Sequence, residues 1–85
     1  MQTTISENAA KILEQINSNP TFSKLITLNQ TQVAEIIGVS STTLINLRRD
    51  GLGPSYIKIE RGKRGRILYP KIEIAEWLSR TIKTM

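Results

Sequence analysis

The side chains with the most distinctive chemistry lie between Ser41 and Arg49, where small hydroxyls, an amide, a β-branched apolar residue and arginines follow one another. Asn46 and Arg49 carry the donors and acceptors that distinguish adenine or guanine in a DNA major groove, and Ile45 can meet a thymine methyl group. A helix that only packs usually exposes mixed Glu and Lys instead. The residues predicted to contact DNA here are Ser41, Thr42, Ile45, Asn46, Arg48 and Arg49.

Basic residues crowd the next part of the chain. Between positions 48 and 71 there are eight lysines and arginines against Asp50 and Glu60, a local net charge of 8 − 2 = +6. Such a concentration suits the neutralisation of phosphates. A solubilising surface is the plainer alternative, whereas a membrane-binding patch would need the charges on an amphipathic helix. The predicted phosphate-contacting residues are Lys58, Arg61, Lys63, Arg64 and Arg66.

Two short helices must position the first group. Asn29 can cap the first helix and Gln32, three residues later, can complete a capping box, so the helix should begin near Gln30. Gly38 should end it in the left-handed conformation. Its apolar stripe consists of Val33, Ala34, Ile36 and Ile37.

The second helix should follow after a tight turn. Ser40 can cap it, and it can run through Arg49 before Asp50 and Gly51 close it. Leu44 and Leu47, about one turn apart, should face inward. Two helices joined in this way form a helix-turn-helix, which presents its second helix to a DNA groove.

A β-hairpin should carry the second group. Residues 56–59 alternate, with Ile57 and Ile59 on one half-buried face, and residues 66–69 can return as a second strand. Gly62 and Gly65 allow the reversal between them. Cations at its tip can straddle a phosphate backbone or enter the minor groove.

Helices should flank this unit. The pattern predicts an amphipathic helix over residues 5–17, with Thr4 and Glu7 as a capping box and Pro20 as a stop. Its apolar stripe can pack on the chain's own core through connector residues, which is the more common outcome, or pair with a second protomer. The connector residues are Phe22, Leu25 and Ile26.

The last helix should open at Pro70 and close the core over the hairpin. Trp77 could stack on a base, but its spacing with aliphatic residues favours a core position. The apolar face consists of Ile74, Trp77, Leu78 and Ile82.

Composition excludes several functions. The 85 residues carry a formal charge of +5 and contain no cysteine or histidine, which rules out disulfides, thiol chemistry and the usual zinc sites. No carboxylate pair stands out for acid–base or metal work, so we expect neither enzymatic activity nor a cofactor. No apolar run is long enough to cross a membrane and no signal peptide is evident, so we expect a cytoplasmic protein.

The chain from Leu28 to Leu78 resembles the small winged helix-turn-helix domains of phage excisionases and AlpA-type regulators, which are similar to the DNA-binding domain of MerR-type proteins. The motifs that carry this resemblance are VAEIIGVS, RRDGLGP, YIKI, RGKRGRILYP and EIAEWL. It implies a mostly helical fold with a small β-hairpin, residues 41–49 as recognition helix and residues 56–69 as wing. It covers about 51 of the 85 residues and leaves the first 26 outside.

Two departures limit what the resemblance implies. Family members commonly carry basic residues at the positions of Ser41, Thr42 and Asn46, so base and van der Waals contacts should matter more here. MerR-type coiled-coil sequence is missing after Leu78, so the mode of assembly does not carry over.

The predicted organisation is an N-terminal helix and connector over residues 1–26, followed by a DNA-binding domain over residues 27–85. The predicted function is sequence-specific binding of double-stranded DNA in the bacterial cytoplasm, as part of the nucleoid. The resemblance implies a recombination directionality factor acting beside a phage integrase, or a transcriptional regulator of a phage or mobile element. Further copies of the chain could occupy adjacent sites.

The alternative is a protein-interaction module whose N-terminal helix or basic wing binds an acidic partner. RNA is a third possibility, with Tyr56 as the one plausible stacking residue.

Overall fold

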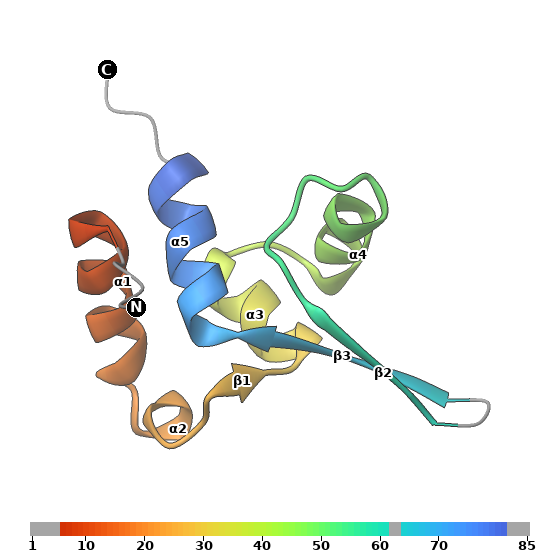
Figure 1. Ribbon diagram of the computed structural model, residues 1–85, viewed down its shortest axis with the longest axis horizontal. Helices are drawn as coiled ribbons and strands as arrows, with labels where there is room; N and C mark the ends of the chain where they lie inside the picture. Colours follow the sequence, from red (N-terminus) through yellow and green to blue (C-terminus); the bar gives the residue numbers. More distant parts are fainter. Residues whose placement is uncertain (1–5, 62–63, 82–85) are drawn as a thin grey trace, which may run out of the picture.

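The computed structural model describes residues 6–61 and 64–81, without the side chains of residues 61, 64 and 81. It is mostly helical with a small antiparallel sheet (Figure 1). The elements are, in chain order, α1 (Glu7–Asn17), α2 (Pro20–Ser23), β1 (Thr27–Leu28), α3 (Gln30–Ile37), α4 (Ser41–Arg49), β2 (Ile57–Arg61), β3 (Arg64–Pro70) and α5 (Lys71–Thr81).

The helix-turn-helix forms where the capping signals predict it. Asn29 Oδ1 accepts the Gln32 amide at 2.8 Å, and Gln32 Oε1 accepts the Asn29 amide at 2.9 Å, which confirms the capping box. Gly38 ends α3 with φ 88°. Ser40 Oγ then accepts the Thr43 amide at 3.1 Å and caps α4. Local hydrogen bonding therefore fixes the start of both helices.

The sheet has three strands in the order β1-β3-β2, one more than the sequence predicts. Thr27 pairs with Pro70 and Leu28 with Tyr69. A strand of two residues is too short to leave a periodic pattern, so β1 is invisible to sequence reasoning. It joins the start of the helix-turn-helix to the end of the hairpin.

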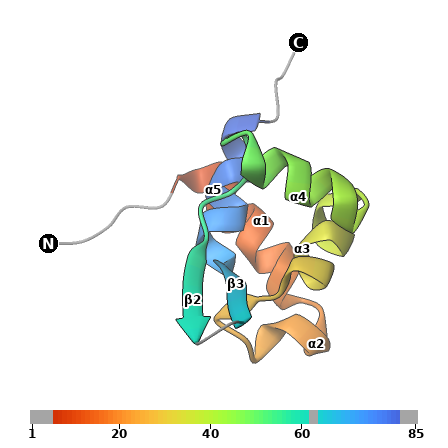
Figure 2. The ribbon, with the colours of Figure 1, turned by 90° about the vertical axis from the view of Figure 1, so that its right-hand side faces the viewer.

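The hairpin of β2 and β3, here called the wing, extends away from the helices (Figure 1) and points toward the viewer in Figure 2. Ile57 and Ile59 are 46% and 40% exposed, so the prediction of a half-buried face on this strand is wrong. The alternation is present, but no helix covers it. Only the base of β3 packs on the core, where Tyr69 is fully buried and Ile67 partly buried.

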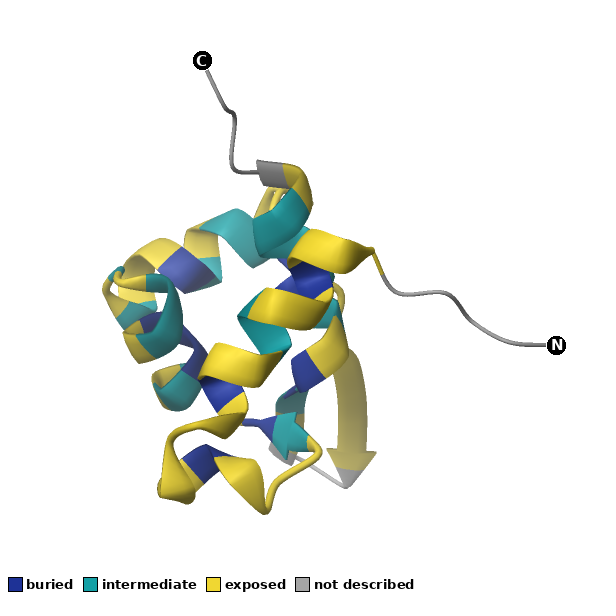
Figure 3. Ribbon diagram, turned by 90° about the vertical axis from the view of Figure 1, so that its left-hand side faces the viewer, coloured by how far each residue is buried: buried dark blue, intermediate teal, exposed yellow. Residues whose placement is uncertain are grey.

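The core lies where α1, α3, α4 and α5 meet the base of the sheet (Figure 3). Burying apolar side chains from elements distant in sequence is what holds such a small domain together. Its buried residues are Ile16, Phe22, Leu28, Val33, Ala34, Leu44, Tyr69 and Ile74.

The N-terminal helix packs on the chain's own core, and α5 is its main partner. Phe22 contributes to that core, whereas Leu25 and Ile26 are exposed. The helix begins at Glu7 with Ser6 as its N-cap, two residues after the predicted start. The predicted cap Thr4 lies outside the described residues.

The last helix differs in two ways from expectation. Pro70 is the final residue of β3, and α5 begins one residue later at Lys71. The helix lies mainly against α1 and not over the wing. Ile74 is buried and Trp77 half-buried, with the indole Nε1 donating to the Leu52 carbonyl at 2.9 Å. The predicted face residue Ile82 lies outside the described residues.

Lys71 is the one buried charged residue among those described, at 8% exposure. Its Nζ donates to Asn17 Oδ1 at 2.5 Å and to the Phe22 carbonyl at 3.0 Å. It therefore links the start of α5 to the end of α1 and to α2. Although it belongs to the basic stretch by sequence, it is unavailable to a ligand at the surface.

Candidate nucleic-acid interface

The outer face of α4 carries the first predicted group. Thr42, Asn46 and Arg49 are exposed and follow one another at offsets of four and seven residues, so they form one row along the helix. Ser41 and Ile45 flank the row and are half-buried. Leu44 has no exposed surface and anchors the opposite side of α4 in the core.

Thr43 is a polar, exposed residue on α4 that the sequence reasoning did not place in the site. Its Oγ1 accepts a hydrogen bond from Ser40 Oγ at 2.9 Å, so its hydroxyl takes part in the helix cap. Thr43 lies next to the row on α4. Its place in the predicted helix cap was the only feature of the sequence that could have drawn attention to it.

Arg48 is separated from that row. It is half-buried, and its Nη1 donates to Gln30 Oε1 at 2.6 Å. Its guanidinium carbon lies 5.8 Å from the centre of the Tyr56 ring. The structure thus directs Arg48 toward other parts of the protein, while its neighbour Arg49 is exposed.

Strand pairing sorts the cations of the wing. Arg66 is exposed and stands opposite Ile59 in the β2–β3 ladder. Lys58 and Glu60 occupy the alternate positions of β2, which belong to the other face. The Lys58 ammonium contacts the Glu60 carboxylate at 3.1 Å, with side chains 58% and 70% exposed. Arg66 and Lys58 therefore face opposite ways.

Two more of the predicted cations lie at the end of the described part of the wing. Arg61 and Arg64 are partners in the ladder and form its last described pair. The predicted cation Lys63 lies outside the described residues.

Fewer basic side chains are therefore available to a ligand than the sequence suggests. Lys71 is buried, Arg48 is engaged with Gln30, and Lys58 is paired with Glu60. Arg49 and Arg66 form no hydrogen bond or ion pair within the described part of the chain, one on α4 and one on the wing. Both side chains are thus available to an external anion.

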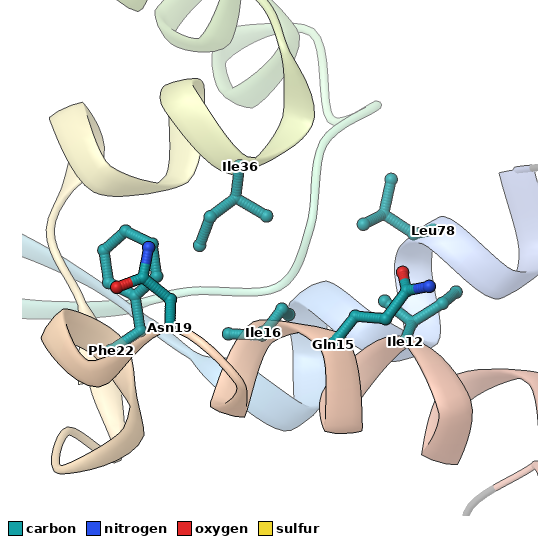
Figure 4. Close-up of a pocket in the computed structure, with 7 residues that line it drawn as sticks. All are labelled: Ile12, Gln15, Ile16, Asn19, Phe22, Ile36 and Leu78. Carbon is teal, nitrogen blue, oxygen red and sulfur yellow. The ribbon is translucent and has the colours of Figure 1, made fainter.

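A shallow cleft lies elsewhere, between α1, α3 and α5 (Figure 4). No acid or base lines it, so it offers no group for proton transfer. Its lining residues are Ile12, Gln15, Ile16, Asn19, Phe22, Ile36 and Leu78.

Over residues 6–61 and 64–81 no cluster of three or more acidic, histidine or cysteine residues could hold a metal ion. Within the same ranges no helix is sufficiently long and apolar to cross a membrane.

A known protein family matches most of this chain. The family described as a helix-turn-helix domain matches residues 27–81. The match begins at β1 and ends with α5, so it includes the helix pair, the wing and the last helix, and it leaves out α1 and α2. Comparison with curated proteins gave no match.

Proposed function

We propose that this protein, which belongs to the helix-turn-helix domain family typical of excisionase-like DNA-binding proteins, recognises a specific double-stranded DNA sequence. In this proposal α4 enters the major groove and presents Thr42, Asn46 and Arg49 to the base edges. The wing lies on the backbone or in the adjoining minor groove, with Arg66 on phosphate. The protein binds DNA and catalyses no reaction.

The observation that carries the proposal is the exposed row on α4. A helix held by a fully buried Leu44 on one side presents an amide, a hydroxyl and a guanidinium on the other. The amide can make a pair of hydrogen bonds to adenine and the guanidinium a pair to guanine, while the hydroxyl can make a single bond to a base edge. The cationic wing beside it supplies the contacts that fix register on the duplex.

Residues 27–85 would form the DNA-binding unit, and residues 1–26 would support it through the packing of α1 on α5. We propose a role as a recombination directionality factor beside an integrase, or as a regulator of transcription in a phage or mobile element. Either role belongs in the bacterial cytoplasm with the nucleoid DNA. A single module buries a small interface, so several copies on adjacent sites would supply the specificity.

Titration of duplex DNA by fluorescence anisotropy at several salt concentrations tests the proposal. Binding should weaken with salt, and Arg66→Ala should reduce the log–log slope by about one for every sequence. Arg49→Ala should weaken binding to the preferred site by about 1–3 kcal/mol and binding to other sequences much less. Lys11→Ala removes an exposed charge from α1, which lies on the opposite side of the molecule from α4 in Figure 1, and should change neither result.

One observation favours the alternative of a protein-binding module. Leu25, Ile26 and Ile72 are 37%, 82% and 42% exposed beside the end of α1. Complete lack of duplex binding at low salt would favour this alternative.

A footprint confined to a single short DNA site, without cooperativity in the titration, would contradict the assembly of several copies.

A further inference from the structure

Arg48 is surrounded by groups from three other parts of the fold. Its Nη1 donates to Gln30 Oε1, at the first residue of α3, and lies 3.5 Å from the Tyr69 hydroxyl of β3. The guanidinium also lies over the Tyr56 ring, which packs against the Tyr69 ring at 6.1 Å between centroids and 56° between planes. We call these four residues the Arg48 cluster.

The cluster suits a guanidinium better than an ammonium. A planar guanidinium can donate in its plane while its face lies over an aromatic ring, whereas a lysine ammonium is a compact and strongly hydrated charge. No carboxylate takes part, since Lys58–Glu60 is the one salt bridge among the described residues. The partners of Arg48 are thus two neutral oxygens and a ring, all of them supplied by the protein itself.

Apart from the buried base of β3, little in the described part of the chain orients the wing. Residues 57–60 of β2 are exposed throughout, and β3 is tied to β1 by two residue pairs. Tyr56 directly precedes β2, and Tyr69 is the buried residue near the end of β3. Contacts to both rings therefore reach both strands at the foot of the wing, and they come from the last turn of α4.

We propose that Arg48 is a positioning residue, which fixes the direction of the wing relative to α4 and does not itself contact DNA. It acts through Tyr56 and Tyr69, while Gln30 holds the guanidinium in place. The consequence for binding rests on the proposed function. The consequence for the shape of the free protein does not.

Residual dipolar couplings of backbone amides in the free protein test the shape. In the wild type, amides 57–60 and 65–69 should fit the same alignment tensor as amides 41–49. In Arg48→Met the wing amides should depart from that tensor while the helices still fit it. Arg49→Met, at the adjacent exposed arginine, is the matched control for shape, and its wing amides should fit the common tensor as in the wild type. An Arg48→Met protein whose wing still fits the common tensor would overturn the proposal.

Two further variants keep the test decisive if Arg48→Met does not fold. Tyr56→Leu removes the ring at a 44% exposed position and should free the wing in the same way. Arg48→Lys keeps the charge but cannot place a planar guanidinium over the Tyr56 ring while donating to Gln30 and Tyr69, and it should not restore the wing. Restoration of both wing alignment and DNA affinity by lysine would show that charge alone is needed, and would overturn the proposal.

A double-mutant cycle tests the effect on binding. We expect Arg48→Met to weaken duplex binding by about threefold to tenfold, and Arg66→Ala to cost less in that background than in the wild type. The pair Arg49→Met and Arg66→Ala should be additive, as for independent contacts. Additivity of Arg48→Met with Arg66→Ala would instead mark Arg48 as an ordinary DNA contact. If no variant and no wild type bound duplex, the proposed function would fall, while the dipolar couplings would still decide the role of Arg48.

Discussion

Replacing Lys71 with methionine removes the buried ammonium and keeps most of its apolar stem. The Phe22 carbonyl would then lose its hydrogen bond at 3.0 Å inside the protein, while Asn17 is exposed and can bind water instead. A buried acceptor left without a donor costs about 1–3 kcal/mol. Relief of the desolvation of the charge offsets part of that loss. We expect Lys71→Met to lower the free energy of unfolding by at most about 3 kcal/mol, and by less in proportion to the desolvation that is relieved.

Urea unfolding followed by circular dichroism measures this change. The urea concentration at the midpoint should fall, while the dependence of the unfolding free energy on urea concentration should stay the same. The melting temperature should fall by about 4–8 °C for each kcal/mol. Lys24→Met, at an exposed position that lines the same surface hollow as Lys71, is the control and should change little. A midpoint at or above that of the wild type would refute the reasoning, because the two hydrogen bonds would then not outweigh the buried charge. The salt dependence of DNA binding should be unchanged, whereas a slope smaller by about one would make Lys71 a phosphate contact.

Three other predictions follow from local geometry. Gly38→Ala should destabilise the fold by about 1–2 kcal/mol, and the cause is the left-handed backbone alone, because an added Cβ meets nothing within 4 Å. Thermal unfolding should show a smaller loss of stability for Gly38→Asn, and equal losses for the two variants would contradict this cause. Asn29→Ala should cost about 0.5–2 kcal/mol by removing the cap of α3, measured by urea unfolding; a cost no greater than that of the exposed control Lys24→Met would show that the capping box contributes nothing. Glu60→Gln should leave the free energy of unfolding within about 0.5 kcal/mol of the wild type, because its salt bridge to Lys58 is exposed. The same variant should strengthen DNA binding at low salt, because it removes an acidic group from the wing. Unchanged affinity in the anisotropy titration would indicate that this face of the wing lies away from DNA.

The parts of the fold that depend on local signals were predictable. The capping box of α3, the left-handed Gly38 and the Ser40 cap each involve residues within four positions of one another, and the structure confirms all three. The errors concern partners distant in sequence. The pairing of β1 with β3 and the packing of α5 on α1 leave no local pattern, and the exposure of Ile57 depends on whether another element covers the strand.

The candidate site shows the same division. Helical periodicity places Thr42, Asn46 and Arg49 in one row on α4, and the structure brings them together on its exposed side. Periodicity alone does not show that Arg48 meets Gln30, because the two are 18 positions apart. Nor does a count of charges reveal that Lys71 is buried. Total charge is a property of composition, but the available charge depends on tertiary contacts.

The pairing of β1 with β3 has a consequence for the order of folding. Leu28 and Tyr69 are partners across about 40 intervening residues, and closing a loop of that length costs about 3 kcal/mol of chain entropy. Two residue pairs cannot offset this alone, so the loop should close only as both fully buried side chains enter the core. We therefore expect α3 and α4 to associate early and the two ends of the loop to meet late. Leu44 of α4 and Tyr69 at the foot of the wing are buried in the same core, so we expect α4 and that foot to unfold as one cooperative unit. A mutation at that foot would lower the fraction of molecules able to bind DNA, although it touches no base.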